Sequence, residues 1–415
     1  MAAPATRLVA DRLRTALRPT AGDPALPLFI AALALRPAII GVGPVAGAMA
    51  AQLAVSHTFV SLLATIPIVC MGLFAPLGPF LAVRIGDRAA MALGLVVVAG
   101  AGALRGAAGS ALEVVALTVL VGVATGATGA LPAYVGKLRA VAGRTTIAAA
   151  ASATGIVVGA TFAAAVAGPI AADLGGWRPA VVLMGLVCLV PAAGWLLLVR
   201  PVPRRLDDAP TSRARVWRRP IAWTLALAYG LQGIVYWGAN AWLPAAFVER
   251  GWSVTSAGGL VALLNGATIA GNLSVITLSG RVSRGSQLAV SAGAIAAGAV
   301  ALTIEPQAAP LATVVMGLGN GMIYPLLLAL TIDIAEDEAA AGAIAAFMLL
   351  VGYELSALGP VVLGTLRDAT GSFRLPLALL AGVGLGVLVP SVALSRATAG
   401  IAPLPGRGVG DREPG

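Results

Sequence analysis

The chain has 415 residues, of which 59% are hydrophobic and only 11% are charged, and its mean hydropathy is +0.95. A soluble domain is about half apolar and about a quarter charged, so this composition argues against water-soluble domains and favours a protein embedded in a bilayer. The formal net charge of +10 does not indicate nucleic-acid binding, because the basic residues lie in short segments between apolar runs.

The apolar residues fall into runs that are long enough to cross a membrane. A helix needs roughly 20 apolar residues to span the hydrocarbon core, because lipid offers the backbone no hydrogen-bond partner. Twelve such runs predict an all-α membrane protein. They cover residues 26–49, 60–82, 89–106, 112–135, 146–171 and 179–199, and then 221–247, 255–280, 288–304, 310–334, 340–366 and 375–394.

A polar segment separates the two sets of six runs, since residues 200–220 carry seven arginines and four prolines. Gly-Pro steps recur at corresponding places in both halves, as in Gly168-Pro169 and Gly359-Pro360. Matching repeats are typical of transporters whose solute site lies between two halves that rock. We therefore expect two pseudo-symmetric six-helix bundles, with this division: tail 1–25, bundle 26–199, linker 200–220, bundle 221–396 and tail 397–415.

The distribution of lysine and arginine predicts the orientation of the chain. If the N-terminus is inside, the cytoplasmic segments hold 21 of these residues and the outer loops hold 5. This bias predicts a multi-pass protein of the cell inner membrane with both termini in the cytoplasm. The five assigned to outer loops are Arg105, Arg178, Arg250, Arg367 and Arg374.

One arginine, Arg36, is left near the middle of the first run. A charge at the bilayer centre costs about 2.5–3.5 kcal/mol on insertion scales, so such a residue normally faces the protein interior or a watery cavity. Its planar guanidinium could bind an anionic or strongly dipolar solute, and a structural ion pair is the alternative. Glu354, at mid-depth in the eleventh run, could be its partner, a proton carrier for coupling, or a carboxyl kept neutral by burial.

The seventh run carries a polar stripe. Gln232, Tyr236 and Asn240 are spaced at i, i+4 and i+8, which places them on one face of a helix. Asn320 and Tyr324 repeat this spacing in the tenth run. Such side chains either line a solute site or make hydrogen bonds between helices. We favour the solute site for Gln232 and Tyr236, and both interpretations stay open for Asn240.

The remaining reactive side chains predict no cofactor. His57 is interpreted as a solvated histidine at the start of the second run, while Cys70 and Cys188 lie in apolar runs and are interpreted as packing residues. The sequence has no clustered Cys, His or carboxylate spacing for a metal site and no nucleotide-binding glycine loop.

Several segments resemble the major facilitator superfamily, and within it the cyanate and nitroimidazole permease branch. They are LRPAIIGVGP (35–44), TIPIVCMGLFAPLGPFLAVRIG (65–86), YGLQGIVYWGANAWLP (229–244), MGLGNGMIYPLLLALT (316–331) and VGYELSALGPVVLGTLRDATGSFRLP (351–376). Two departures are Ala82, where the superfamily usually has an aspartate, and Ala164, which replaces a glycine of a helix-5 pattern typical of antiporters. The resemblance implies that helices 1, 4, 7 and 10 line a central cavity, which would bring together Arg36, Gln232, Tyr236, Asn320 and Tyr324.

These observations predict a secondary transporter that works by alternating access on a small polar solute. The resemblance suggests a cyanate-like anion or a small nitrogen heterocycle. One alternative is a proton-coupled drug exporter, which the glycine-proline pattern of the fifth run favours, and another is a membrane sensor without transport, against which the short tails argue. We expect no enzymatic activity, because no nucleophile and base are paired. The expected partners are the solute, the lipid bilayer and, if transport is coupled, protons; we expect a monomer that binds no nucleic acid.

Overall fold

The computed structural model describes residues 24–139, 145–200, 216–278, 281–336 and 338–398, and these residues form helices joined by turns. The predicted tails and the predicted linker lie largely outside the described residues. The helices of the first half are α2 (Ala25–Leu33), α3 (Pro37–Ile40), η1 (Gly43–Val45), α4 (Ala46–Leu53), α5 (His57–Leu73), α6 (Leu77–Ile85), α7 (Asp87–Ala107), α8 (Ala111–Arg139), α9 (Thr145–Asp173), α10 (Trp177–Leu186) and α11 (Leu189–Leu198).

The second half begins after residue 215. Its helices are η2 (Val216–Arg218), α12 (Pro220–Glu249), α13 (Val254–Leu278), α14 (Arg284–Ile304), η3 (Pro306–Ala308), α15 (Ala309–Asp333), α16 (Glu338–Ser356), α17 (Leu358–Thr370), α18 (Arg374–Gly386) and α19 (Leu388–Thr398).

Ten segments of the described chain are long and apolar enough to cross a membrane, and the pair α5 and α6, bent by 64°, makes up to eleven. Helix α12 is outside this set although it has 30 residues. Its polar side chains, which include Gln232 and Asn240, lower its hydropathy. With α12 the helices form the twelve rods that the sequence predicts, and the all-α membrane fold is confirmed.

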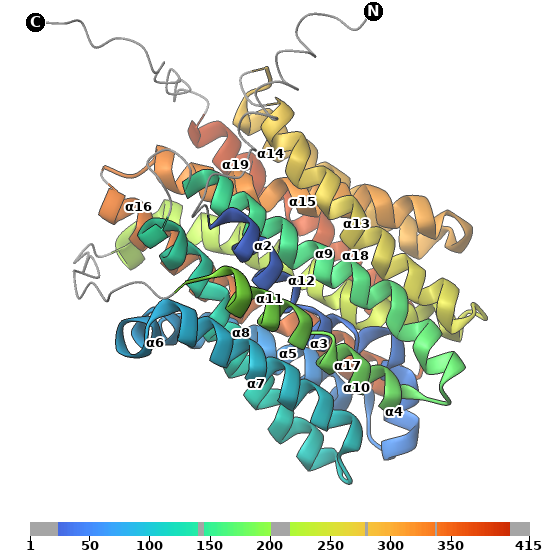
Figure 1. The fold of residues 1–415 in the computed structure, drawn as a ribbon. Coiled ribbons are helices and arrows are strands. Elements are labelled where there is room, and N and C mark those ends of the chain that lie inside the picture. The colour runs from blue at the N-terminus through green and yellow to red at the C-terminus, as the bar shows by residue number, and fades with distance from the viewer. Residues whose placement is uncertain (1–23, 140–144, 201–215, 279–280, 337, 399–415) are drawn as a thin grey trace, which may run out of the picture.

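The two halves repeat one packing pattern. In the first half α2 packs on α9, α5 and α7 pack on α8, and α10 packs on α7. In the second half α12 packs on α16, α13 and α14 pack on α15, and α18 packs on α14. Each second-half pair involves the rods that correspond in order to the first-half pair, which is the arrangement of two pseudo-symmetric bundles. In Figure 1 α9 of the first half runs beside α13 of the second half, and these two helices pack together.

The first membrane-crossing segment is broken. Helix α2 ends at Leu33, and the chain resumes as α3 with Arg36 as its N-cap residue and Pro37 as its first residue. Proline has no N–H to continue the helix and its ring opposes the preceding turn. The break therefore follows directly from the sequence, and it places Arg36 on an irregular segment between two short helices.

The halves meet closely at the end of the bundle where α4 joins α5, which we call the α4–α5 end. A Cβ atom added at Gly43 of η1 would collide with the carbonyl oxygen of Asn240 on α12, so only glycine permits this approach. Helix α5 also packs on α17, and η1 packs on α12. The α4–α5 end is therefore closed between the halves.

Candidate functional site

Arg36 lies at the break of the first membrane-crossing segment and is half-buried. Its Nη1 atom is 3.2 Å from the sulfur of Met71 on α5, and its Cζ atom lies 4.7 Å from the centre of the Trp237 ring on α12. A guanidinium at this distance from an aromatic face makes a cation–π contact. Within the part of the chain that the structure describes, no carboxylate forms an ion pair with Arg36. The charge is therefore held by a soft sulfur and a ring, both of which a stronger anionic partner could outcompete.

Three tyrosines surround the same region. The ring of Tyr229 on α12 lies 5.7 Å from that of Tyr324 on α15 and 5.5 Å from that of Tyr353 on α16. Coulombic interactions also join Arg36 to Tyr229, Tyr236 and Tyr324. A positive charge from the first half thus faces a cluster of phenol groups from the second half. The sequence stripe identified Tyr236 and Tyr324, and the structure adds Tyr229 and Tyr353.

Gln232 and Asn320 are joined directly. The Gln232 side-chain nitrogen donates to Oδ1 of Asn320 over 2.7 Å, and both residues are buried. Asn320 in turn donates to the carbonyl of Met316 on its own helix. The described hydrogen bonds link neither amide to Arg36. The predicted pair is therefore brought together, through an interhelical bond between α12 and α15.

Tyr236 belongs to a second network. Its hydroxyl donates to Oδ1 of Asn265 on α13 over 2.6 Å, and the side-chain nitrogen of Asn265 donates to Oδ1 of Asn240 over 2.8 Å. Asn265 is fully buried, so it crosslinks α12 and α13 in an apolar setting. Sequence reasoning missed Asn265, although an amide in an apolar run is a recognisable signal. For Asn240 the hydrogen-bonding interpretation is the one that the contacts favour.

Glu354 lies on α16 and faces α5. A Cβ atom built on Gly72 would lie 2.7 Å from Oε1 of Glu354, and this oxygen is buried without a hydrogen-bond partner among the residues that the structure describes. Glu354 forms no ion pair with Arg36 among the described residues, so the structure does not make it the partner of that arginine. A partly buried carboxyl between the two halves is chemically able to take up a proton.

A small hollow lies between the halves on the α4–α5 side of Trp237. It is lined mainly by apolar side chains of the broken segment, α5 and α12, and Ser61 and Asn240 are its polar members. Trp237 lines this hollow and also carries the Arg36 contact. A flat solute bound near Arg36 would therefore have an aromatic surface beside it.

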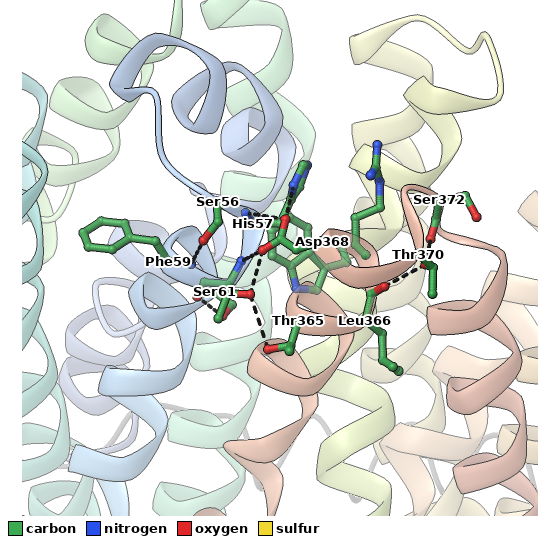
Figure 2. Close-up of polar contacts among 12 residues, drawn as sticks. Ser56, His57, Phe59, Ser61, Thr365, Leu366, Asp368, Thr370 and Ser372 are labelled. Carbon is green, nitrogen blue, oxygen red and sulfur yellow. Dashed lines mark hydrogen bonds and ion pairs between the residues drawn. The ribbon is translucent and has the colours of Figure 1, made fainter.

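A carboxylate from the second half caps a helix of the first half at the α4–α5 end. Oδ1 of Asp368 on α17 accepts hydrogen bonds from the His57 backbone N–H at 3.0 Å and contacts His57 Nδ1 at 2.9 Å. Oδ2 accepts from the Thr58 N–H at 2.7 Å and from the Thr58 hydroxyl at 2.6 Å. Figure 2 shows Asp368 pointing at His57 at the start of α5. We call Asp368, His57 and Thr58 the latch.

The latch corrects the interpretation of His57. This histidine is half-buried rather than freely solvated, with its ring 5.5 Å from Trp242 and 5.9 Å from Phe373. The first free N–H groups of a helix attract a negative charge, and Asp368 supplies that charge from the opposite half. The sequence did not reveal the pairing because 311 residues separate the partners.

Arg105 also differs from its sequence interpretation. It is predicted in an outer loop, but it lies in the last turn of α7 and is only 1% exposed. Cys188 is buried in the apolar core as predicted, and its Sγ lies 3.3 Å from the carbonyl oxygens of Ala34 and Met184. Both side chains contact carbonyl groups of the broken first segment. Arg105 reaches this segment because it lies in the last turn of α7, inside the bundle.

The membrane-crossing helices, the repeated packing and the Arg36 cation between the halves are features of a multi-pass membrane transport protein. A sequence profile of the Major Facilitator Superfamily matches residues 28–360. The chain belongs to the Major Facilitator Superfamily.

Two relatives that are named for their solutes support membership of this family. The chain is 27% identical over 365 residues to the cyanate transport protein CynX of Escherichia coli, which covers 88% of this chain and 95% of that protein. It is 28% identical over 363 residues to the 2-nitroimidazole transporter of Escherichia coli, covering 84% of this chain and 89% of that protein. The crystal structure of a D-xylose-proton symporter has the same fold, with a TM-score of 0.73 at 16% identity over 91% of this chain and 97% of that one.

Proposed function

We propose that the chain carries a small polar solute across the inner membrane by alternating access, with Arg36 as the solute-binding cation. The relatives transport cyanate and 2-nitroimidazole by their names, so the proposed solute class is a cyanate-like anion or a small nitrogen heterocycle. Gln232, Tyr236, Asn320 and Tyr324 are the proposed polar lining of the site. The proposed topology has both termini in the cytoplasm, so that the α4–α5 end faces outward, and the proposed transporting unit is a monomer.

The observation that carries this proposal is the Arg36 guanidinium at a helix break, stacked on Trp237 and paired with no described carboxylate. A buried cation without an anion is costly. An arriving anion would make charge-assisted, bidentate hydrogen bonds with the planar guanidinium of Arg36. The Trp237 ring would stack on a flat solute. The same contacts suit cyanate, which is anionic, and a nitroimidazole, whose nitro group is strongly dipolar.

Uptake into proteoliposomes tests the proposal, with labelled cyanate and labelled 2-nitroimidazole as probes. We expect Arg36→Ala to reduce uptake at least tenfold and Arg36→Lys to reduce it less, because lysine keeps the charge but loses the fork. Arg84→Ala is the matched control, since Arg84 also stacks on a ring, with its Cζ 4.9 Å from the centre of Phe80, but is exposed. Uptake that is unchanged in Arg36→Ala would contradict the role of Arg36.

We further propose that Glu354 carries a proton if transport is coupled to a proton gradient. Its Oε1 is buried between α16 and α5 and has no hydrogen-bond partner among the described side chains and backbone groups. Movement of the halves would change its environment there. Uptake is to be measured with and without an imposed pH gradient. We expect Glu354→Gln to remove any stimulation by the gradient while leaving down-gradient flux in place. Equal stimulation in the variant and the parent would exclude Glu354 as the coupling carboxyl.

A further inference from the structure

The break in the first membrane-crossing segment exposes backbone carbonyl groups inside the protein. The described backbone hydrogen bonds of the break run from Ala34 and Leu35 N–H to Ala31 and Ala32, from Ile39 and Ile40 N–H to Arg36, from Gly41 N–H to Pro37, and from Val42 N–H to Ile39. This pattern passes over the carbonyls of Leu33, Ala34, Leu35 and Ala38, and the last three of these residues are buried. A buried carbonyl needs a donor from elsewhere.

Arg105 supplies one of these donors. Its Nη2 donates to the carbonyl of Ala38, and its Nη1 is 3.5 Å from the hydroxyl oxygen of Thr118 on α8. Arg105 is 1% exposed, and its Nε has no hydrogen-bond partner in the described part of the chain. No carboxylate within the described ranges makes an ion pair with it. Burial of an arginine without a carboxylate is costly. The Arg105 guanidinium is positioned instead to contact the carbonyl dipoles of the break.

Cys188 supplies the second donor. It lies in the break between α10 and α11, is fully buried, and its Sγ is 3.3 Å from the carbonyl oxygen of Ala34 and 3.3 Å from that of Met184. Two carbonyls at the break, those of Ala34 and Ala38, thus receive donors from two different segments, Arg105 on α7 and Cys188 between α10 and α11. The two accepting residues flank Arg36 in the sequence.

Close packing of α7 and α10 brings both donors to the break. A Cβ atom on Gly102 would lie 3.1 Å from Cβ of Ala38 and 3.3 Å from Cα of Gly185. A Cβ atom on Gly185 would collide with the backbone nitrogen of Ala103. Small residues at these positions let the helices approach closely, and the approach leaves the Arg105 side chain no route to solvent.

We propose that Arg105 and Cys188 form a brace that holds the break of the first segment open and so positions Arg36 toward the space between the halves. Both are positioning residues, since neither contacts the proposed solute site. Only the purpose that we assign to the brace, which is to position Arg36 for a solute, rests on the proposed function. The geometry itself predicts that the location of residue 36 depends on the donors at 105 and 188.

Thiol labelling tests the brace without any solute. The variant Arg36→Cys places a reactive thiol at the break, and labelling is followed with a charged methanethiosulfonate reagent in protein held in nanodiscs. The native cysteines are buried, and their background is measured in the parent chain. We expect Arg105→Met, which keeps length but removes every donor, to change the labelling rate at position 36 at least fivefold. Cys188→Ala is expected to change it less and in the same direction.

Two controls separate positioning from general damage. Arg178→Met removes a guanidinium that donates from α10 to the carbonyls of Gly106 and Ala108, the same chemistry away from the break, and should leave the rate at position 36 unchanged. Arg105→Lys keeps a cation and one donor, so it should restore the rate at least partly. An unchanged rate in Arg105→Met and Cys188→Ala, or an equal effect of Arg178→Met, would overturn the brace. Loss of uptake in Arg36→Ala is read separately and tests the proposed function alone.

Discussion

Replacing Asp368 with asparagine is expected to open the α4–α5 end of the bundle. In the parent chain the carboxylate accepts from the His57 and Thr58 N–H groups and from the Thr58 hydroxyl. An asparagine presents one oxygen and one N–H₂ donor, so about half of these contacts are lost and the charge no longer faces the helix N-terminus. Loss of a helix cap costs about 0.5–2 kcal/mol, and the 27% exposure of the Asp368 side chain argues against a larger value.

A cost of about 0.5–2 kcal/mol changes an equilibrium by a factor of about 2–30. If about 5% of parent molecules are open at this end, about one tenth to three fifths of Asp368→Asn molecules should be open. Spin labels on Gln52→Cys near α5 and Ala369→Cys on α17 would report the opening by pulsed electron resonance, because both sites are exposed. The matched control is Asp173→Asn, which removes an exposed carboxylate at the end of α9.

The expected result is a second, longer distance in Asp368→Asn that is weak or absent in the parent and in Asp173→Asn. The double variant with Thr58→Val should add little, because the two residues share the same contacts. A distance distribution that does not differ between Asp368→Asn and the parent would show that the latch does not set the closed population.

Two further predictions concern contacts between helices. Gly43→Ala places a Cβ against the Asn240 carbonyl, so the same spin-label pair should report a wider α4–α5 end; an unchanged distance would mean that η1 and α12 can separate without opening the halves. Asn265→Ala leaves the Tyr236 hydroxyl and the Asn240 amide without their shared partner, at a cost of about 1–3 kcal/mol, and should lower the melting temperature in detergent. Asn272→Ala, on the same helix and only partly buried, is the control, and an equal loss of stability would refute the special role of Asn265.

The helix count was predictable because each span needs a long apolar run, and the chain supplies such runs. Helix α12 was also predicted, as the run 221–247, although its polar residues, which the bundle buries, lower its hydropathy. Arg36 was recognisable because a charge in an apolar run is costly. Its neighbours were only partly recognisable: Tyr236 and Tyr324 follow helical spacing, while Tyr229 and Tyr353 became part of the cluster through packing between α12, α15 and α16.

The sequence by itself determined that this chain crosses a membrane many times, that its halves repeat, and that one arginine interrupts an apolar run, because hydropathy, glycine-proline spacing and charge are local properties. Only the tertiary structure decided what each polar group meets. Arg105, which was expected in a loop, is buried and contacts the break. His57 is paired with Asp368, and Arg36 is paired with no described carboxylate. These outcomes depend on contacts between residues far apart in the chain, which only the packing of helices can establish.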